Sequence, residues 1–334
     1  MLNSGILLMR EVRASAPGKV NLTLRVGQPA EDGYHPLVTV FEALNMRETV
    51  TVRTSRRLGI HVTTTAYLPN GRVDEATTAA MADLDPENHL CVKAARSLQK
   101  LAAMGPWGHT AAGIEIHVEK HVPMAGGMAG GSADAAATLV ACNALWALGL
   151  NSDQLEMMGR ALGADVPACL TGGIALGTGR GDRMSLLADG SDEPRHHWAI
   201  ALAHGGLSTP AVFRQLDQMG GPAGKWELLE DLSDEAGALL TGSAEQAAPC
   251  LVNDLTEAAL ELRPELVKTI AGARHAGALA VILSGSGPTI AALATSAEDA
   301  QRIADQLAQL PNVSAAPTTW GAARGAMIEH EDNA

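Results

Sequence analysis

Alternating apolar and polar positions predict strands along much of the chain. Residues 114–119, IEIHVE, alternate strictly, which is the period-two pattern of a half-buried strand. Residues 20–26 alternate in the same way after a predicted break at Ala16–Pro17–Gly18, and this geometry places Lys19 and Asn21 on one face. Further strands are predicted at residues 37–44, 49–54, 59–65, 171–181, 198–203, 279–283 and 289–294.

Helices are predicted where apolar residues recur three and four positions apart and capping residues bound the run. Thr209 and Pro210 are predicted as the N-cap and first turn of one of them. Because helices and strands mix without strict alternation, we expect an α+β fold rather than a doubly wound parallel sheet. The helices are expected at residues 90–104, 133–148, 152–162, 209–217, 256–275 and 297–310, with surface insertions at 66–87 and 220–248, the second holding one short helix at most.

Four glycines fall within residues 126–131, between strand 114–118 and the helix that follows Ser132. Glycines let a backbone approach a ligand closely, and the free N–H groups of a helix start attract phosphate oxygens. The loop matches neither the G-x-x-x-x-G-K-[ST] nor the G-x-G-x-x-G motif. A flexible linker or a close helix–strand contact is the alternative, but the strong strand and helix on either side favour a phosphate-binding loop.

Composition excludes several kinds of partner. The chain has 334 residues, 46% of them hydrophobic and 18% charged, which suits a packed globular protein. Its formal net charge of −13 argues against nucleic acid or an anionic membrane as partner, since both require a basic surface. The four cysteines are scattered without a C-x-x-C pair, and no stretch reaches membrane-spanning length. We therefore expect reduced thiols, a cytoplasmic location and a small-molecule substrate.

Three segments together resemble the three motifs of the GHMP kinases, the superfamily of galactokinase and of homoserine, mevalonate and phosphomevalonate kinases. They are residues 16–22 (APGKVNL), 123–134 (PMAGGMAGGSAD) and 284–288 (SGSGP). Residues 32–35 (DGYH) and 162–167 (LGADVP) are similar to motifs of the members that act on 4-diphosphocytidyl-2-C-methyl-D-erythritol. The similarity runs from about residue 13 to residue 310.

The resemblance implies a two-domain GHMP kinase fold with the active site in the cleft between the domains. An ATP-binding domain is expected over residues 1–182 and a substrate-side domain over residues 183–334. The implied reaction is ATP-dependent phosphorylation of the 2-hydroxyl of 4-diphosphocytidyl-2-C-methyl-D-erythritol, in the methylerythritol phosphate route to isoprenoid precursors. A homoserine or mevalonate type of kinase, or a non-catalytic nucleotide-binding protein of the same fold, is the alternative. A monomer or weak homodimer is expected.

Lys19 and Asp165 form the catalytic pair that the resemblance implies. Asp165 would accept or orient the proton of the acceptor hydroxyl, while Lys19 would keep Asp165 ionised and stabilise charge on the oxygen. Taken singly, a solvated strand lysine and a turn aspartate would be the simpler interpretations. ATP and Mg2+ are the implied cofactors, with Ser132 as a possible magnesium contact and no metal site built by protein ligands alone. The implied ATP-binding residues are Pro123, Met124, Ala125, Gly126, Gly127, Met128, Ala129, Gly130, Gly131, Ser132 and Ala133.

Substrate recognition is assigned by the same resemblance to Asn21, Tyr34, His35 and Phe213. Aromatic residues make up only 3% of the chain, so an aromatic side chain in a loop stands out. Tyr34 and Phe213 would stack on the cytosine ring, and His35 would contact its polar edge. Asn21 would hydrogen-bond near the transferred group or the diphosphate. A core position for Phe213 on the apolar face of its helix is the alternative.

Overall fold

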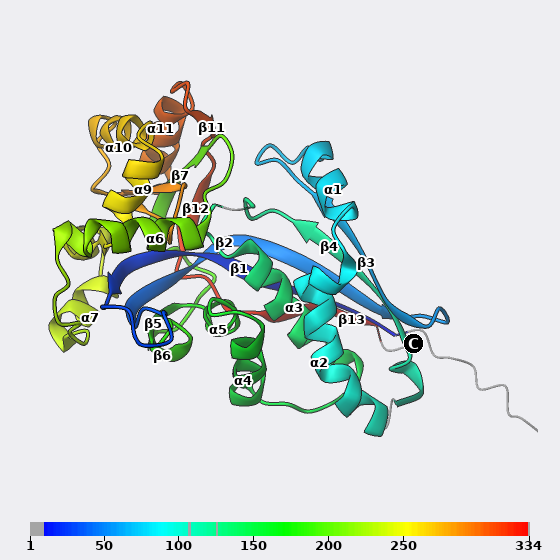
Figure 1. Ribbon diagram of the computed structural model, residues 1–334. Coiled ribbons are helices and arrows are strands. Elements are labelled where there is room, and N and C mark those ends of the chain that lie inside the picture. The colour runs from blue at the N-terminus through cyan, green and yellow to red at the C-terminus, as the bar shows by residue number, and fades with distance from the viewer. Residues whose placement is uncertain (1–9, 106–107, 125, 333–334) are drawn as a thin grey trace, which may run out of the picture.

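The computed structural model describes residues 10–105, 108–124 and 126–332. Its strands form one connected mixed sheet in which seven strands follow the order β13-β1-β2-β12-β7-β10-β9 (Figure 1). Helices pack against this sheet in two groups, one against each half of the strand order. The predicted α+β class is confirmed.

The first half of the sheet is built around two long antiparallel strands, β1 (Glu11–Val26) and β2 (Leu37–Thr54). The predicted break in β1 is wrong: the strand runs on through residues 16–18, and only its pairing with β2 shifts between Pro17 and Lys19. A bulge of this kind absorbs the proline without ending the ladder. The other strands here are β3 (Gly59–Ala66), β4 (Gly113–Lys120), β5 (Ile174–Thr178), β6 (Arg183–Ala188) and, paired with β1, β13 (Met327–Asp332).

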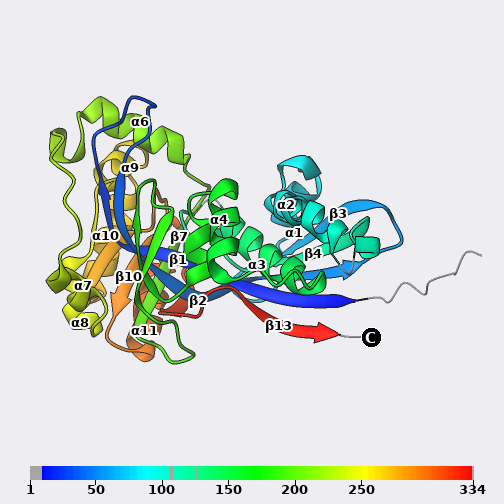
Figure 2. The ribbon, with the colours of Figure 1, turned by 90° about the horizontal axis from the view of Figure 1, so that it is seen from below.

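Helices α2 (Leu90–Met104), α3 (Gly130–Leu145), α4 (Ser152–Leu162) and α5 (Val166–Thr171) cover one face of this half (Figure 2). Alanines make α3 thin enough to lie close to both the sheet and its neighbouring helices, and residues 133 and 135–137 are fully buried. The predicted bounds of α2 and α4 agree with the structure. The short helix α5 was not predicted, since its six residues are too few to show a helical period.

The second half of the sheet carries its own layer of helices. The predicted helix 256–275 is wrong as one unit: it is split into α9 (Thr256–Leu262) and α10 (Leu266–His275), because Pro264 cannot continue a helix. Ser208, not Thr209, is the N-cap of α6. The remaining elements are β7 (His196–Ala203), β8 (Val252–Asn253), β9 (Ala280–Leu283), β10 (Ile290–Ala294), β11 (Val313–Ala315), β12 (Thr318–Gly321), α6 (Thr209–Met219) and α11 (Ala297–Leu307).

Both predicted insertions contain helices. α1 (Glu75–Ala82) lies within 66–87 and buries none of its residues, as expected of a surface element. The stretch 220–248 holds α7 (Asp234–Leu240) and α8 (Ala244–Ala247), so the expectation of one short helix at most is wrong. Short 3-10 turns complete the chain at Pro86–Asn88, Gly108–Thr110, Pro222–Gly224 and Ala248–Cys250.

The two halves are joined by a buried polar contact. Glu42 on β2 accepts hydrogen bonds from His196 Nδ1 (2.7 Å) and Trp198 Nε1 (2.8 Å), both on β7, and all three side chains are buried. The last strand, β13, pairs with β1 in the first half of the sheet. The expected boundary between two domains at residues 182 and 183 stays a prediction. Within the described part of the chain, no helix is long and apolar enough to cross a membrane.

Candidate active site

Three segments that are far apart in the sequence meet at one point of the fold. The backbone N–H of Lys19 donates to the carbonyl of Met128 (3.1 Å), and Ser284 Oγ donates to the carbonyl of Gly127 (3.1 Å). Gly127 has a φ of +77°, and a Cβ there would lie 2.0 Å from the carbonyl oxygen of Ser284. This contact therefore requires glycine, because any side chain would push the loop off the turn 284–288.

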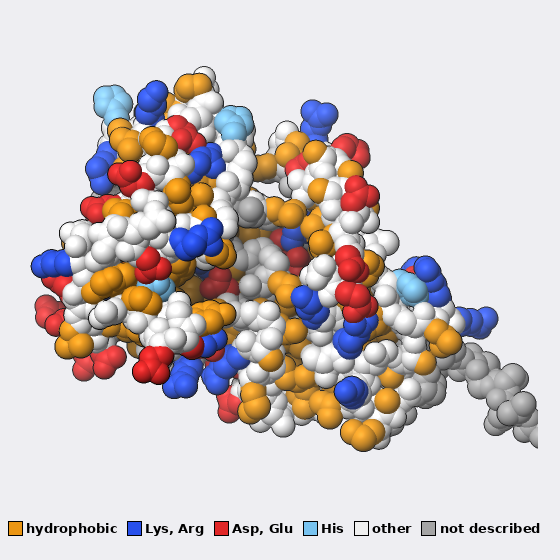
Figure 3. All heavy atoms as spheres, viewed as in Figure 1, with side chains coloured by type: hydrophobic (Ala, Val, Ile, Leu, Met, Phe, Trp, Pro, Cys, Tyr) orange, Lys and Arg blue, Asp and Glu red, His pale blue; other side chains and the backbone are white. Residues whose placement is uncertain are grey.

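A cavity of about 1060 Å³ opens where these segments meet. Figure 3 shows the surface hollowed between the α6 side of the molecule and the α1–α2 side. The glycine loop lines one part of the cavity, and α6 with the turn 33–35 lines another. A volume of this size lies at the top of the range that is typical of small-molecule sites.

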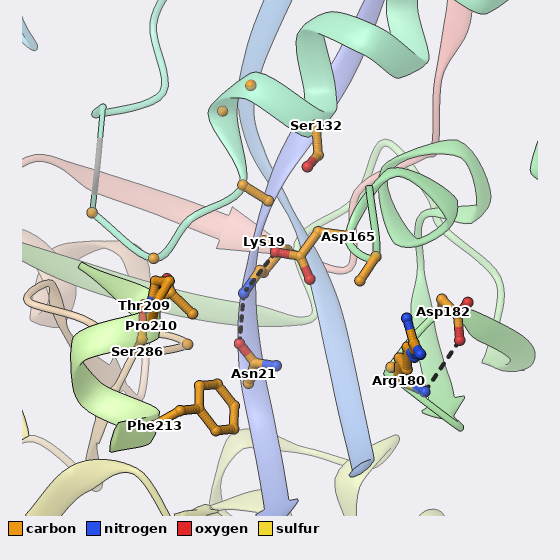
Figure 4. A pocket seen from close by; sticks show the side chains of 18 of the residues that line it. Lys19, Asn21, Ser132, Asp165, Arg180, Asp182, Thr209, Pro210, Phe213 and Ser286 are labelled. Atoms are coloured by element: carbon orange, nitrogen blue, oxygen red, sulfur yellow. Dashed lines mark hydrogen bonds and ion pairs between the residues drawn. The ribbon is translucent and has the colours of Figure 1, made fainter. Parts of the chain in front are cut away.

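Lys19 lies at the floor of the cavity, with only 4% of its surface exposed. Its Nζ donates to Asn21 Oδ1 (2.7 Å), which confirms that the two side chains share a face of β1 (Figure 4). Asn21 Nδ2 in turn donates to Thr39 Oγ1 (2.8 Å), and this hydroxyl donates to the carbonyl of Thr23. The relay leaves the ammonium group of Lys19 fixed at the cavity surface, 3.8 Å from Asp165 Oδ2.

Asp165 reaches the same point from the other side of the cavity. It is the N-cap residue of α5, where its side chain makes no capping hydrogen bond. The side chain is 39% exposed and lines the cavity. Figure 4 shows Lys19 and Asp165 turned toward each other across the pocket. A carboxylate free of the helix end, beside a fixed ammonium group, is available to a ligand hydroxyl.

The glycine loop leads directly into α3, which begins at Gly130. The N-cap of α3 is Ala129, a non-glycine residue with a φ of +62°. Met128 and Ala133 are buried and do not line the cavity, and Ala125 lies outside the described residues. The helix start with its free N–H groups faces the cavity, as expected for phosphate binding. The predicted ATP-loop residues that do line it are Pro123, Met124, Gly126, Gly127, Ala129, Gly130, Gly131 and Ser132.

A buried charged cluster under this loop was not predicted. Lys120 Nζ donates to Glu48 Oε1 (2.9 Å) and to Asp134 Oδ2 (2.6 Å), and the three side chains are each 4% exposed or less. Burial and the carboxylate of Asp134 raise the pKa of Glu48 to about 8. Burial lowers the pKa of Lys120, but the two carboxylates outweigh it and raise that pKa overall. A signal was present in the sequence, because Lys120 continues the buried face of the alternating strand 114–118.

His35 is buried in the substrate-side part of the cavity, and its ring is already engaged by the protein. Nδ1 donates to the carbonyl of Gly27 (2.9 Å), and Nε2 lies 3.3 Å from Asp217 Oδ1 on α6. Phe213 and Trp226 flank the imidazole, with ring centroids 5.2 and 5.3 Å from it. Trp226 was missed, since nothing in its sequence surroundings distinguishes it from a core residue.

Phe213 is half-buried, packs against the core of the second half and still lines the cavity (Figure 4). Tyr34 is 57% exposed and lines the cavity too. The predicted substrate residues thus all line this one cavity. Figure 4 shows Asn21 and Phe213 on the opposite side of Lys19 from Ser132 at the helix start. Among the described residues, no group of three or more His, Cys, Asp or Glu side chains could hold a metal ion.

Comparison with known proteins agrees with this geometry. A family model described as GHMP kinases N terminal domain matches residues 89–173, and one described as GHMP kinases C terminal matches residues 226–312. The 4-diphosphocytidyl-2-C-methyl-D-erythritol kinase of Streptomyces coelicolor is 44% identical over 319 residues, covering 95% of this chain and 99% of its own. The kinase of the same name from Cutibacterium acnes is 42% identical, covering 95% and 96%.

Solved structures give the same picture. A crystal structure of 4-(cytidine 5'-diphospho)-2C-methyl-D-erythritol kinase aligns with a TM-score of 0.69 and 30% identity, covering 92% of this chain and 99% of the other. Homoserine kinase from Cytophaga hutchinsonii aligns with a TM-score of 0.65 at 20% identity, which shows the shared fold alone. The two-domain GHMP kinase fold expected from the sequence is confirmed, and the chain belongs to the GHMP kinases, within the family of 4-diphosphocytidyl-2-C-methyl-D-erythritol kinases.

Proposed function

We propose that the chain transfers the γ-phosphoryl group of ATP to the 2-hydroxyl of 4-diphosphocytidyl-2-C-methyl-D-erythritol. The observation that carries this proposal is that the ion pair of Lys19 and Asp165 lies in one cavity with the glycine loop and with Phe213, Tyr34 and His35. The names of the relatives at 42–44% identity support the same substrate. Both nucleotide and acceptor would then reach the catalytic pair from opposite sides.

Asp165 accepts the proton of the attacking hydroxyl, or orients it in line with the γ-phosphate. Its carboxylate is partly exposed and, among the residues that the structure describes, contacts a side chain only through the ion pair with Lys19. Lys19, fixed by Asn21, stabilises negative charge that develops on the hydroxyl oxygen. Phosphoryl transfer depends mainly on such positioning and electrostatic stabilisation. Asn21 thereby acts on the reaction through Lys19.

Mg2+ fits this site as an ion held mainly by the phosphates of ATP. The described residues contain no cluster of acidic, cysteine or histidine ligands for it, and the half-buried Ser132 hydroxyl lies at the helix start beside the phosphate site. When bound, the ion neutralises charge on the phosphate oxygens. The free N–H groups at the start of α3 orient those phosphates.

Cytosine stacks in this proposal between Tyr34 and Phe213. Because both ring nitrogens of His35 are engaged by Gly27 and Asp217, the imidazole holds the wall of the pocket. Among the described residues no hydrogen-bond partner is found for the backbone N–H and C=O of His35, which leaves these groups free for the polar edge of the base. Stacking on a base contributes about 1–3 kcal/mol. This arrangement favours a cytidine substrate over homoserine or mevalonate, which offer no ring to stack.

The test measures turnover and ligand binding together. Asp165→Asn should leave ATP affinity nearly unchanged and lower kcat by about two orders of magnitude or more, as expected for a positioned base. Asp153→Asn, an exposed aspartate on α4, is the matched control. Near-normal turnover in folded Asp165→Asn would remove this residue from the chemistry. Turnover of mevalonate or homoserine but not of the cytidine compound would overturn the substrate, and ATP binding without any turnover would favour a non-catalytic protein.

The cellular setting is part of the same proposal. We propose that the chain is a monomer or weak homodimer. Its four cysteines are free, three of them buried, which supports a reducing compartment such as the cytoplasm. Sedimentation at micromolar concentration tests the first point: a tight dimer or larger assembly would contradict it.

A further inference from the structure

Arg180 lies against the exposed ring of Tyr34 at the mouth of the cavity. The Cζ atom of its guanidinium group is 3.7 Å from the centroid of the tyrosine ring. Its Nη2 atom also donates to Asp32 Oδ2 at 2.8 Å. One face of the Tyr34 ring is therefore covered by the protein itself, and the other face remains for a ligand.

Arg180 is held in place by the turn between β5 and β6. The N–H of Gly181 donates to the carbonyl of Thr178 (3.1 Å), and Asp182 Oδ1 accepts from the N–H of Arg180 (3.2 Å; Figure 4). Arg160 on α4 donates to the carbonyl of Asp182 (3.0 Å). Hydrogen bonds within the turn and to α4 thus fix the backbone that carries Arg180.

Asp32 fixes the other partner. Its Oδ1 accepts from the backbone N–H of Tyr34 (3.0 Å), while its Oδ2 holds Arg180. The backbone N–H of Tyr34 and the guanidinium of Arg180 keep the pKa of Asp32 below its usual value, so the carboxylate is ionised at neutral pH. Backbone and ring of Tyr34 are therefore held by two connected contacts, although the residue lies in an exposed turn that follows Gly33 with its φ of +79°.

We propose that Arg180 is a positioning residue for base recognition: it holds the Tyr34 ring in the orientation that stacks on cytosine. This inference rests on the function proposed above. An exposed tyrosine without a backing group would lose side-chain freedom on stacking, and that entropy would be subtracted from the affinity. With Arg180 behind the ring, the freedom is already lost before the substrate arrives. The acceptor specificity of the enzyme then depends on a residue outside the aromatic pair.

The chemistry of the backing group matters. A guanidinium group is flat and can lie along the ring face while donating to Asp32, whereas a lysine ammonium is a compact, strongly hydrated point charge. Arg180→Lys keeps the charge and can still pair with Asp32. It should nevertheless behave like Arg180→Gln if stacking on Tyr34 is what counts. Recovery by Arg180→Lys would instead indicate a purely electrostatic role and overturn the inference.

The first measurement is a split between kinetic constants. Arg180→Gln should raise KM for the cytidine substrate about twofold to fivefold, in keeping with an exposed cation–π contact, and leave kcat and KM for ATP unchanged. Arg183→Gln, three residues along and outside the cavity lining, is the control and should change neither KM. An unchanged cytidine KM in Arg180→Gln, while wild type turns over the substrate normally, would refute the inference alone.

The second measurement asks whether Arg180 acts through Tyr34. In a Tyr34→Ala background, Arg180→Gln should cause no further loss, because no ring remains to be held. Inhibition by cytidine and by cytidine diphosphate should weaken by the same factor in Arg180→Gln. A loss restricted to the diphosphate, or one that persists without Tyr34, would show that Arg180 binds phosphate directly. If wild type neither binds nor turns over any cytidine compound, the proposed function itself fails.

Discussion

Replacing Lys120 with methionine removes the ammonium group that Glu48 and Asp134 share beneath the glycine loop. Methionine has nearly the same length and shape, so the change tests charge more than packing. In wild type the ammonium group donates to both carboxylates in a site with almost no exposure. Removing one partner of a buried ion pair costs about 3–5 kcal/mol, because the remaining charge stays buried without compensation.

The loss of folding stability in Lys120→Met should depend on pH. Burial and the carboxylate of Asp134 raise the pKa of Glu48 to about 8 in wild type, and Lys120 opposes this rise, so the pKa of Glu48 should rise further in Lys120→Met. A raised folded pKa gives stability that is fully present below the unfolded pKa and is lost as pH rises through the folded pKa. We therefore expect about 3–5 kcal/mol of destabilisation at pH 8.5. At pH 6, where Glu48 is protonated, one buried charge fewer is left without its partner, so the destabilisation should be smaller than at pH 8.5.

Urea unfolding of the ligand-free protein at the two pH values measures this directly, with Lys100→Met on the exposed face of α2 as the control. Adding Glu48→Gln to Lys120→Met should recover part of the loss at pH 8.5, because one buried charge disappears. A loss below about 1 kcal/mol, or an equal loss at both pH values without any recovery, would refute the electrostatic reasoning.

Three other outcomes follow from the structure. Phe213→Ala should raise KM for the cytidine substrate by the equivalent of about 1–3 kcal/mol and spare ATP if the ring stacks; a loss of about 3–5 kcal/mol in unfolding free energy with an unchanged KM would make it a core residue instead. Gly127→Ala should raise the ATP KM more than the cytidine KM, because its Cβ meets Ser284; equal ATP affinity would contradict this close contact. Burial lowers the pKa of His196, but the Glu42 carboxylate outweighs this and raises that pKa overall. The free energy of unfolding of wild type should therefore fall from pH 6.5 upward more steeply than that of Glu42→Gln. Parallel curves of unfolding free energy against pH would refute this reasoning.

The local sequence pattern was enough to predict those elements whose period and boundary residues lie within one segment. The helix 90–104 has its period and its boundary residues within one segment, and the structure reproduces both ends. The shared face of Lys19 and Asn21 follows from strand alternation alone, and the hydrogen bond between them confirms it. Pro264 shows the limit of pattern: the apolar period continues across it, but the missing N–H ends the helix there.

Contacts between distant segments could not be predicted in this way. Glu48, Lys120 and Asp134 come from β2, β4 and α3, so their meeting depends on strand register and on where α3 starts. Arg180 and Tyr34 are likewise brought together by the pairing of β2 with β5. Strand pairing fixes which residues become neighbours, and a single sequence does not reveal it.

The charge of the cavity shows how an acidic chain can bind two anionic ligands. The whole chain carries −13, yet the described residues that line the cavity include five cations and four aspartates. Lys19, Lys120 and Arg180 each already pair with a carboxylate or an amide of the protein. Their positions are therefore fixed before a ligand enters, and ordering them costs nothing on binding. Surface acidity repels unrelated anions, while the cavity keeps the few oriented cations that two phosphorylated ligands require.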